Sequence, residues 1–464
     1  MEKNDIVTVT AESIGTQGEG IARTEGVTLF IPYLLPGERA RVKVLKVKGS
    51  VGYGKIEEIE TPAEERVRPR CSVFQRCGGC QLQHLRYREQ LKFKTELVRD
   101  TLKKIAGITA PVSPCERSEK EYAYRNKLQL PVGKQGEENA VGFFAERSHR
   151  IVPTDECPIH PDWSKQLISA LKNFMEKCGL DGYNEQTKRG HVRHIVVREL
   201  RRKYIITLVV CVQELKGIDY FVHLLDEIFP EYSLWLNFND RDTNVIFGEK
   251  FTLVKGCGVY DCTDAGISFE AGPNTFVQVN DGVRTKLYEK VLELVEEGPV
   301  VDCYSGGGLL TAMLAKKCGR AYGIEVIPEA SACANALAER NALMDKMTNV
   351  CGKVEQELSA ILAREQIKTV VLDPPRAGVE RSVLKALMKS APKRIVMVSC
   401  NPATLARDVG ILTGTLVETE KGELKKSENP HTMYEIQLIQ PYDMFPQTRH
   451  VESVVCLTRK ESNI

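Results

Sequence analysis

Short apolar runs alternate with helical patterns through the last third of the chain, from about residue 274. The runs are P-V-V-D-C-Y, R-A-Y-G-I-E, K-T-V-V-L-D and R-I-V-M-V-S-C, and each is followed by Gly, Pro or Asn and then by a helical stretch. Strands that are apolar throughout are buried on both faces, as happens when helices cover a parallel sheet. The pattern predicts a Rossmann-like α/β domain over residues 274–464.

The first 60 residues have the pattern of a small OB-like β-barrel. I-V-T-V-T alternates, V-T-L-F-I-P ends at a proline, and G-E-R-A-R-V-K-V-L-K-V-K-G alternates basic and apolar residues, with glycines between the runs. Short, regular strands of this kind are typical of small barrels. Arg39, Arg41 and Lys43 fall on one face, and the change of parity after Val44 predicts a bulge.

Residues 61–273 mix strand and helix patterns, so we expect a mixed α/β central domain between barrel and C-terminal domain. At roughly 150 residues per domain, the length of 464 residues agrees with such a multidomain chain. The helical part near residues 90–120 is expected to pack on the C-terminal domain.

Composition points to a folded protein outside the secretory route. Hydrophobic residues make up 42% and charged residues 27% of the chain, the N-terminus M-E-K-N-D is charged, and no run reaches the about 18 apolar residues of a membrane span. We expect a cytoplasmic monomer without membrane contact. Its 15 cysteines would then be thiols or metal ligands rather than disulfides.

The net charge of +2 conceals two basic segments. Residues 61–110 hold eleven Arg or Lys against five Asp or Glu, and residues 186–203 hold seven against one, so each carries a net +6. Basic segments in a nearly neutral chain suit a protein that binds a polyanion on one face, although a solvated charged surface would have the same pattern.

Three cysteines lie within ten residues in Cys71-x5-Cys77-Gly-Gly-Cys80. Soft thiolates at this density suit an iron–sulfur cluster or zinc. A fourth ligand is needed, and Cys157 in the turn-like D-E-C-P is our choice, with Cys115 as the alternative. Three clustered cysteines plus a distant one favour a four-iron cluster, and zinc remains open.

A glycine-rich turn follows the first strand of the C-terminal domain, in D302-C-Y-S-G-G-G. Backbone at such a turn can approach a ligand at the helix N-terminus, which favours anionic groups. The next strand ends at Glu325, where a carboxylate meets ribose hydroxyls in dinucleotide-binding folds. The two features together predict an adenosine-type ligand.

Two later strands also end in reactive residues. Asp373 begins D-P-P-R, whose prolines form a rigid lip where open sheets bind ligands. Amino-methyltransferases have a related lip that ends in an aromatic residue, whereas Arg376 stands here. Cys400 ends the next strand just before a predicted helix, whose dipole is expected to lower the pKa of the thiol and favour a nucleophile.

Taken together, the motifs resemble the S-adenosylmethionine-dependent RNA uracil-5-methyltransferases that carry a TRAM domain and a four-iron (4Fe-4S) cluster. The resemblance runs nearly end to end, through G-E-G-I-A-R, I-P-Y-L-L-P-G-E, C-x5-C-G-G-C-Q-L-Q-H, Y-R-N-K, T-F-V-Q-V-N, D-P-P-R-A-G, S-C-N-P-A-T-L-A-R-D and F-P-Q-T-R-H-V-E. One departure is Ser305-Gly306, where the family often has Cys-Gly.

The resemblance implies a role for each matching residue. The cluster ligands would be Cys71, Cys77, Cys80 and Cys157. The S-adenosylmethionine pocket would be lined by Gln278, Tyr304, Glu325 and Asp373. Cys400 would be the nucleophile, Glu452 the base, and Phe276 the ring that stacks on the target base.

The reaction class explains these residue types. C5 of uracil is a poor nucleophile, so a thiolate adds to C6 first, C5 takes the methyl group, and a base then removes the C5 proton. The substrate implied is RNA, with 23S ribosomal RNA favoured over transfer RNA. An RNA cytosine-5-methyltransferase and a non-enzymatic RNA-binding factor are the alternatives, and radiolabelled methyl transfer to RNA would exclude the second.

Overall fold

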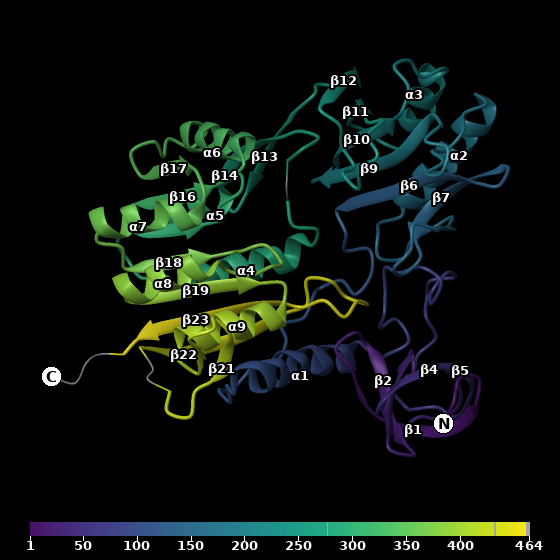
Figure 1. The fold of residues 1–464 in the computed structure, drawn as a ribbon. Coiled ribbons are helices and arrows are strands. Elements are labelled where there is room, and N and C mark those ends of the chain that lie inside the picture. The colour runs from purple at the N-terminus through teal and green to yellow at the C-terminus, as the bar shows by residue number, and fades with distance from the viewer. Residues whose placement is uncertain (276, 431–432, 461–464) are drawn as a thin grey trace. The chain divides into compact units, whose positions relative to one another are not determined.

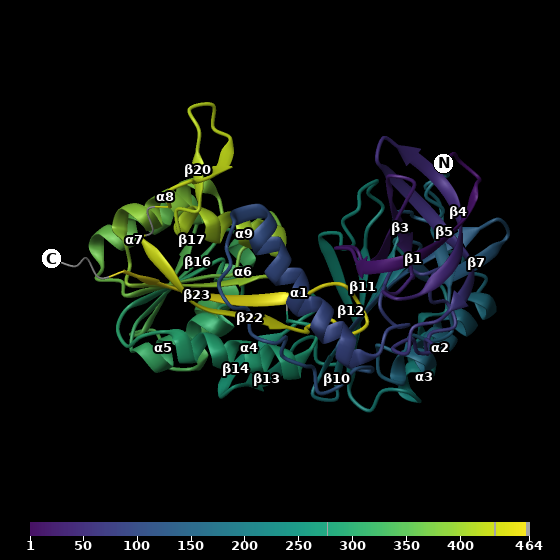
Figure 2. The ribbon, with the colours of Figure 1, turned by 90° about the horizontal axis from the view of Figure 1, so that it is seen from below.

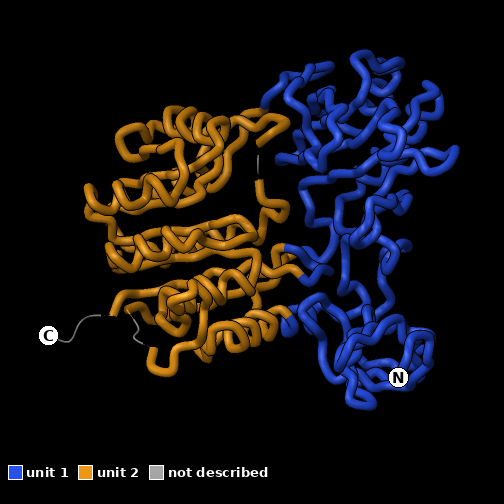
Figure 3. The backbone as a smooth tube through the Cα atoms, in the orientation of Figure 1, with its two compact units in different colours: residues 1–93, 120–259, 445–449 blue, residues 94–119, 260–444, 450–464 orange. Residues whose placement is uncertain are grey.

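The computed structural model describes residues 1–275, 277–430 and 433–460. Two compact units account for the chain (Figure 3). Unit 1 comprises residues 1–93, 120–259 and 445–449, and unit 2 comprises residues 94–119, 260–444 and 450–464. The helix α1 (Tyr87–Ala106) therefore contributes its first residues to unit 1 and the remainder to unit 2.

A closed barrel of five strands forms the N-terminal part of unit 1. The strands are β1 (Ile6–Ile14), β2 (Glu19–Thr24), β3 (Val27–Pro32), β4 (Arg39–Lys48) and β5 (Val51–Thr61). Their order is β1-β2-β3-β5-β4, and β3 and β5 run parallel. Alternate side chains such as Val9, Leu29 and Val42 fill the interior. The expected bulge is confirmed, since the pairing of β4 with β5 shifts between Val44 and Lys46.

Two of the basic side chains of β4 pair with carboxylates of β5. Arg39 Nε lies 2.8 Å from Glu60 Oε2. Arg41 Nη1 lies 3.1 Å from Glu58 Oε2, and Glu58 is its register partner on β5. The antiparallel pairing of a basic strand with an acidic one therefore neutralises this pair of arginines.

The central part of unit 1 is a seven-stranded sheet in the order β12-β11-β10-β9-β6-β7-β8. The strands are β6 (Lys127–Gln135), β7 (Glu138–Phe144), β8 (Ile151–Pro153), β9 (Val192–Leu200), β10 (Lys203–Val210), β11 (Tyr232–Phe238) and β12 (Lys250–Lys255). The helices α2 (Trp163–Lys177) and α3 (Ile218–Asp226) pack on one face. Leu128 of β6 and Val197 of β9 belong to the core on that face.

The main sheet of unit 2 has the order β17-β16-β15-β18-β19-β23-β22 (Figure 1). The strands are β15 (Val300–Cys303), β16 (Ala321–Glu325), β17 (Met347–Cys351), β18 (Thr369–Leu372), β19 (Arg394–Ser399), β22 (Tyr434–Tyr442) and β23 (Glu452–Arg459). The first five strands are parallel. This confirms the predicted Rossmann-like α/β fold, in which ligands bind at the carboxyl ends of the strands.

Helices cover both faces of this sheet. They are α4 (Asp281–Leu294), α5 (Leu309–Cys318), α6 (Pro328–Arg340), α7 (Val354–Arg364), α8 (Arg381–Ser390) and α9 (Pro402–Leu412). The helices α4 and α5 lie on one face, and α7, α8 and α9 lie on the other (Figure 2). Two small hairpins, β13 (Tyr260–Asp264) with β14 (Ile267–Ala271) and β20 (Leu416–Glu418) with β21 (Leu424–Lys426), complete the unit.

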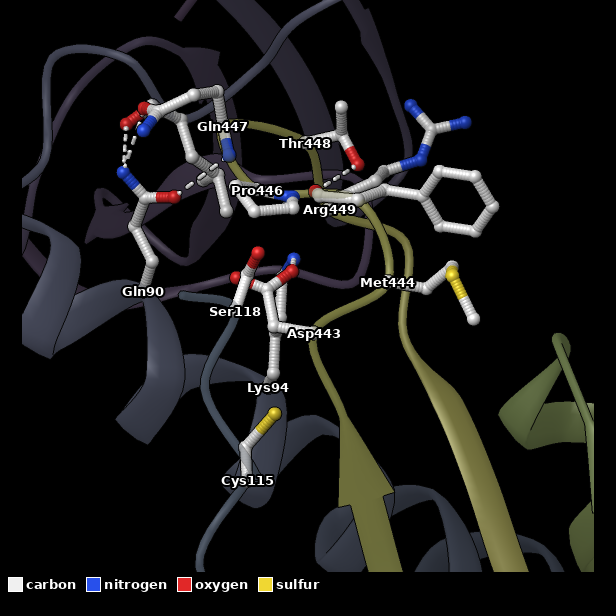
Figure 4. Close-up of polar contacts among 12 residues, drawn as sticks. Gln90, Lys94, Cys115, Ser118, Asp443, Met444, Pro446, Gln447, Thr448 and Arg449 are labelled. Atoms are coloured by element: carbon white, nitrogen blue, oxygen red, sulfur yellow. Dashed lines mark hydrogen bonds and ion pairs between the residues drawn. The ribbon is translucent and has the colours of Figure 1, made fainter. Parts of the chain in front are cut away.

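The loop between β22 and β23 has a buried polar anchor in unit 1. Gln447 is 1% exposed, its backbone N–H donates to Gln90 Oε1 at 3.0 Å, and Gln90 Nε2 donates to Gln447 Oε1 at 3.0 Å (Figure 4). Two side-chain amides thus bond each other reciprocally, which fixes the loop to α1. Within the described residues, no helix is both long and apolar enough for a membrane span.

Candidate active site

The glycine-rich turn after β15 opens the site in unit 2. Tyr304 has φ 64° and Gly308 has φ 81°, so the chain reverses through left-handed backbone. A Cβ at Gly308 would lie 2.7 Å from the Cβ of Ala334, so only glycine fits at this position. Tyr304 presents a buried hydroxyl that makes no hydrogen bond of standard geometry with the described residues, although the backbone of Glu380 lies close enough to affect its pKa.

Glu325 ties the end of β16 to this turn. Its Oε2 accepts from the N–H of Gly306 at 2.8 Å, and its Oε1 accepts from the N–H of Ile327 at 2.9 Å. The side chain is 9% exposed. Each oxygen keeps a second lone pair, so the carboxylate can accept hydrogen bonds from a ligand as well.

Two buried carboxyl groups, those of Asp302 and Asp373, lie at the carboxyl ends of β15 and β18. Burial raises the pKa of Asp302 to about 7, with further upward contributions from Asp373 and Glu325, while a 2.6 Å hydrogen bond from Thr311 Oγ1 acts in the opposite direction. Burial also raises the pKa of Asp373 to about 7. The carboxyl ends of β15 and β18 therefore present acids whose protonation changes near neutral pH.

Cys400 follows β19 and precedes α9, as the sequence predicts. Asn401 is the N-cap residue of α9, and its Oδ1 accepts from Ala403 N at 3.1 Å. The pKa of the thiol is nevertheless raised, chiefly by burial and then by Glu452 and Asp373, whereas Arg376 lowers it through its charge and a hydrogen bond. The expected lowering by the helix dipole is wrong for the free protein, because burial and two carboxyl groups outweigh it.

Glu452 is the first residue of β23 and is 5% exposed. Its pKa is raised to about 8, first by burial and then by Asp373, and Arg376 lowers it. Because Glu452 and Asp373 both act on Cys400, these residues form one electrostatic cluster, which Arg376 joins.

Two further predicted site residues, Gln278 and Phe276, lie in the segment that precedes α4. Gln278 is half-buried and lies two residues before Asn280, the N-cap of α4. Asn280 Nδ2 donates to Ser118 Oγ at 3.0 Å and to the carbonyl of Met444 at 3.3 Å, which fixes the segment that carries Gln278. Phe276 lies outside the described residues.

The four predicted cluster ligands lie in unit 1 and act on one another. Burial first, and then the neighbouring thiols of Cys77 and Cys71, raise the pKa of Cys80 to about 12. Burial likewise raises the pKa of Cys157, with additional contributions from the other three thiols. Across the described residues, however, no group of three His, Cys, Asp or Glu has metal-holding geometry.

The alternative fourth ligand, Cys115, has a different environment. It lies in unit 2, and its N–H donates to Thr95 Oγ1 at 2.9 Å. Burial, Asp443 and Glu116 raise the pKa of its thiol, whereas Lys94 lowers it. Cys157 is therefore the better candidate, because its thiol interacts with the other three.

Comparison with known proteins identifies the family. Residues 86–460 match the tRNA (Uracil-5-)-methyltransferase family, and residues 2–56 match the TRAM domain. The chain belongs to this methyltransferase family. It is an S-adenosylmethionine-dependent RNA (uracil-5-)-methyltransferase.

Relatives match over nearly their whole length. The methyltransferase is 39% identical over 476 residues to an uncharacterized RNA methyltransferase of Oceanobacillus iheyensis, covering 100% of this chain and 98% of the relative. It is 37% identical over 472 residues to one of Halalkalibacterium halodurans, covering 99% and 98%. The crystal structure of Pyrococcus abyssi tRNA (uracil-54, C5)-methyltransferase in complex with S-adenosyl-L-homocysteine is similar with a TM-score of 0.76 and 29% identity, over 97% of this chain and 99% of that one.

Sequence reasoning missed two residues of the methyltransferase site. Arg376 was interpreted only as a departure from an aromatic lip, yet it acts on both Cys400 and Glu452. Its position directly after two prolines at a strand end was the available signal. Asn280 had no such signal, because its partners Ser118 and Met444 are more than 160 residues away in the sequence.

Proposed function

We propose that the chain transfers a methyl group to C5 of a uridine in RNA through a covalent bond between Cys400 and C6. The observation that carries this proposal is the electrostatic cluster of Cys400, Glu452, Asp373 and Arg376 at the carboxyl end of the sheet. A nucleophile and a carboxyl group with a pKa near neutrality are the two groups that the reaction requires.

In the proposed sequence, Cys400 first loses its proton and its thiolate bonds to C6. The electron pair displaced toward C5 bonds to the methyl group that S-adenosylmethionine would supply, and the methyl–sulfur bond breaks so that S-adenosyl-L-homocysteine leaves. Glu452 removes the C5 proton, and the C–S bond breaks as the ring regains its double bond. Arg376 favours the thiolate by its positive charge. The pKa of about 8 for Glu452 suits a group that accepts a proton and releases it near neutral pH.

We propose that Gln278, Tyr304, Glu325 and Asp373 bind S-adenosylmethionine. The free lone pairs of Glu325 suit ribose hydroxyls, and the buried hydroxyl of Tyr304 suits a polar ligand group. Phe276 is proposed to stack on the uracil after it leaves its own stack, an interaction worth about 1–3 kcal/mol per base.

We propose that Cys71, Cys77, Cys80 and Cys157 hold a 4Fe-4S cluster with a structural role. The support for this proposal is chemical: the four thiols act on one another electrostatically and are partly or fully buried, and the N–H of Gly79 lies 3.3 Å from Cys77 Sγ, as amides do at cluster sulfurs. Anaerobically purified protein should be brown and contain iron and sulfide. Colourless protein with stoichiometric zinc would overturn the assignment.

We propose 23S ribosomal RNA as the substrate, because a TRAM barrel with a cysteine cluster is typical of relatives that act on ribosomal RNA. Transfer RNA is the second candidate, since the similar Pyrococcus abyssi enzyme is a tRNA methyltransferase. We also propose a cytoplasmic monomer with domains at residues 1–60, 61–273 and 274–464.

The deciding experiment is nucleoside mass spectrometry of separated ribosomal and transfer RNA from cells lacking this protein. Loss of 5-methyluridine from one fraction would identify both the reaction and the substrate class. Purified protein and S-adenosylmethionine should restore the nucleoside to that fraction. Failure to methylate either RNA in vitro would contradict the proposal.

A further inference from the structure

Several cations of the two basic segments already have partners within the protein. In residues 186–203, Lys188 Nζ lies 2.6 Å from Asp242 Oδ1, and Arg193 donates to the carbonyl oxygens of Arg241 and Thr243 at 2.7 and 2.6 Å. In residues 61–110, the ion pairs include Arg66 with Glu38, Arg86 and Arg88 with Glu65, Lys92 with Glu89 and Lys94 with Asp443. Segment charge is thus a poor guide to the cations that remain free for a ligand.

Three cations of unit 1 stand apart, and we call Arg125, Lys127 and Arg198 the cation row. Lys127 on β6 and Arg198 on β9 are direct register partners. Their neighbours Leu128 and Val197 point into the core beneath α2 and α3. Since side chains alternate along a strand, the row belongs to the opposite face of the sheet.

The row has no acidic partner among the described residues. Arg198 is 5% exposed, and its Nη1 is buried without a hydrogen-bond partner, as is the Nε of Arg125. The pKa of Lys127 is lowered to about 8, first by burial and then by Arg198 and Arg125, and burial lowers the pKa of Arg198 to about 10. The cations therefore repel one another where solvent screens them poorly.

Such an arrangement is unfavourable in the free protein, because a buried charge without a counter-ion destabilises the fold. An anion with several oxygen acceptors would remove that penalty. Guanidinium groups match phosphate oxygens in geometry as well as charge. Arg125 and Lys127 are only half-buried, so an anion can reach the row from solvent.

We propose that the cation row binds a backbone phosphate of the substrate RNA, an inference that rests on the proposed function. The central domain then holds the RNA strand on the side of its sheet opposite α2 and α3, where Arg125 and Lys127 are half-buried. The ring of Phe445, whose centroid is 5.7 Å from Cζ of Arg125, flanks the row. Arg125 also lowers the pKa of Cys80, so tests of the row use Lys127 and Arg198.

The variants K127M and R198M test the proposal, with K134M as the matched control. Lys134 lies on the same strand, but its Nζ is 2.7 Å from Asp181 Oδ1. Binding of a short fluorescein-labelled single-stranded RNA is measured by anisotropy over a range of salt concentrations. Each row variant should lose roughly tenfold in affinity at low salt. The slope of log affinity against log salt should fall by about 0.7, the value for one phosphate contact to a single strand.

Thermal melting separates this result from misfolding. Removal of an unpaired buried charge should leave the melting temperature of K127M and R198M unchanged or raised, while K134M changes neither RNA affinity nor salt slope. At saturating RNA, kcat should stay near the wild-type value, because the reacting groups lie in unit 2. Wild-type affinity and salt slope in both row variants would overturn the proposal.

A second measurement uses the unmodified protein and needs no variant to fold. Acetylation of Lys127 by an amine-reactive ester should slow when the RNA is present, and acetylation of Lys134 should not. Equal rates for Lys127 with and without RNA would overturn the proposal. Methylation assays on the same preparation keep the proposed function separate, since binding to the row is scored whether or not that RNA is methylated.

Discussion

At the scale of single residues, Cys400 carries the most specific prediction. The variant C400A should lose methyl transfer by roughly a thousandfold or more, because no other thiol of the site occupies the end of β19. Binding of S-adenosylmethionine should remain within about twofold of wild type, since none of its proposed contacts involves the thiol. Filter-bound radioactivity and equilibrium dialysis measure the two effects. Turnover at a substantial fraction of the wild-type rate would exclude Cys400 as the nucleophile.

Variants of Glu452 and Cys400 should stop the reaction at different steps. In E452Q the thiol can still add to C6 and C5 can still take the methyl group, but the C5 proton has no acceptor. A protein–RNA adduct should accumulate and be visible as a denaturant-resistant band, whereas C400A and the double variant C400A/E452Q should give none. Equal adduct in wild type and E452Q would remove Glu452 from the proton-transfer step.

The raised pKa of Glu452 also has consequences for pH dependence. The carboxyl group must be ionised to accept a proton, so its titration should make kcat/KM rise with pH through about 8, and ionisation of the Cys400 thiol, whose pKa is raised by burial, should extend the rise to higher pH. Stability has the opposite sign: the folded protein retains a proton on Glu452 that the unfolded chain releases above 4.5, so unfolding becomes easier as pH rises from 4.5 to about 8. The variant E452Q should not show this decrease in stability with rising pH. Denaturant titrations of both proteins across that window give the difference, and parallel stability curves would contradict it.

At the scale of elements, the sequence predicted what local pattern determines. The strands ending at Asp373 and Cys400, the glycine turn and the bulge after Val44 all depend on neighbouring residues, and each was found. The antiparallel hairpin of β22 and β23 was not predicted, although its first β23 residue, Glu452, was singled out. The two strands flank a loop in which Gln447 hydrogen-bonds Gln90, a residue 357 positions away. The spacing of apolar residues along the chain cannot predict a partner at that distance.

Charge was the property that sequence predicted least well. Counting Arg and Lys identified segments 61–110 and 186–203 but not which cations remain unpaired. Arg41 meets a carboxylate through strand register, and Lys94 meets one through a contact between α1 and the end of β22. Conversely, Lys127 falls outside both segments. Pairing depends on tertiary neighbours, so it could not be read from composition.

The buried ion pair of Lys94 and Asp443 should contribute strongly to the free energy of unfolding. Both side chains are fully buried, and the Oδ2 atom of Asp443 has no hydrogen-bond partner among the residues that the structure describes. K94M would leave a buried carboxylate unpaired and should lower the free energy of unfolding by about 3–5 kcal/mol. The double variant K94M/D443L should recover most of that loss. Urea unfolding checks both.

The control for this prediction is K92M on the same helix. Lys92 Nζ lies 2.7 Å from Glu89 Oε1, but its side chain is 62% exposed. An exposed pair contributes about 0–1 kcal/mol, so K92M should unfold almost like wild type. If K94M lowered the free energy of unfolding as little as K92M, the buried pair would not stabilise the protein as proposed.

At the scale of the whole molecule, the proposed functions divide between the two units. The four cysteines and the cation row belong to unit 1, whereas Cys400, Glu452 and the proposed S-adenosylmethionine contacts belong to unit 2. Each unit has a sheet and a buried core of its own. A change confined to the cysteine site should therefore leave cofactor binding intact while it alters the unit that is proposed to hold RNA.

The variant C77A/C80A tests this division. It should lose iron, because two of four proposed ligands are gone, and unit 1 should become easier to unfold, since a bound group that favours the folded state no longer contributes. RNA affinity should fall with it, whereas the dissociation constant for S-adenosylmethionine should stay within about twofold of wild type. The exposed Cys333 of unit 2 supplies the control, because C333A should keep its iron. Loss of S-adenosylmethionine binding in C77A/C80A would show that the cysteine site supports the catalytic unit as well, and retained iron would contradict the ligand assignment.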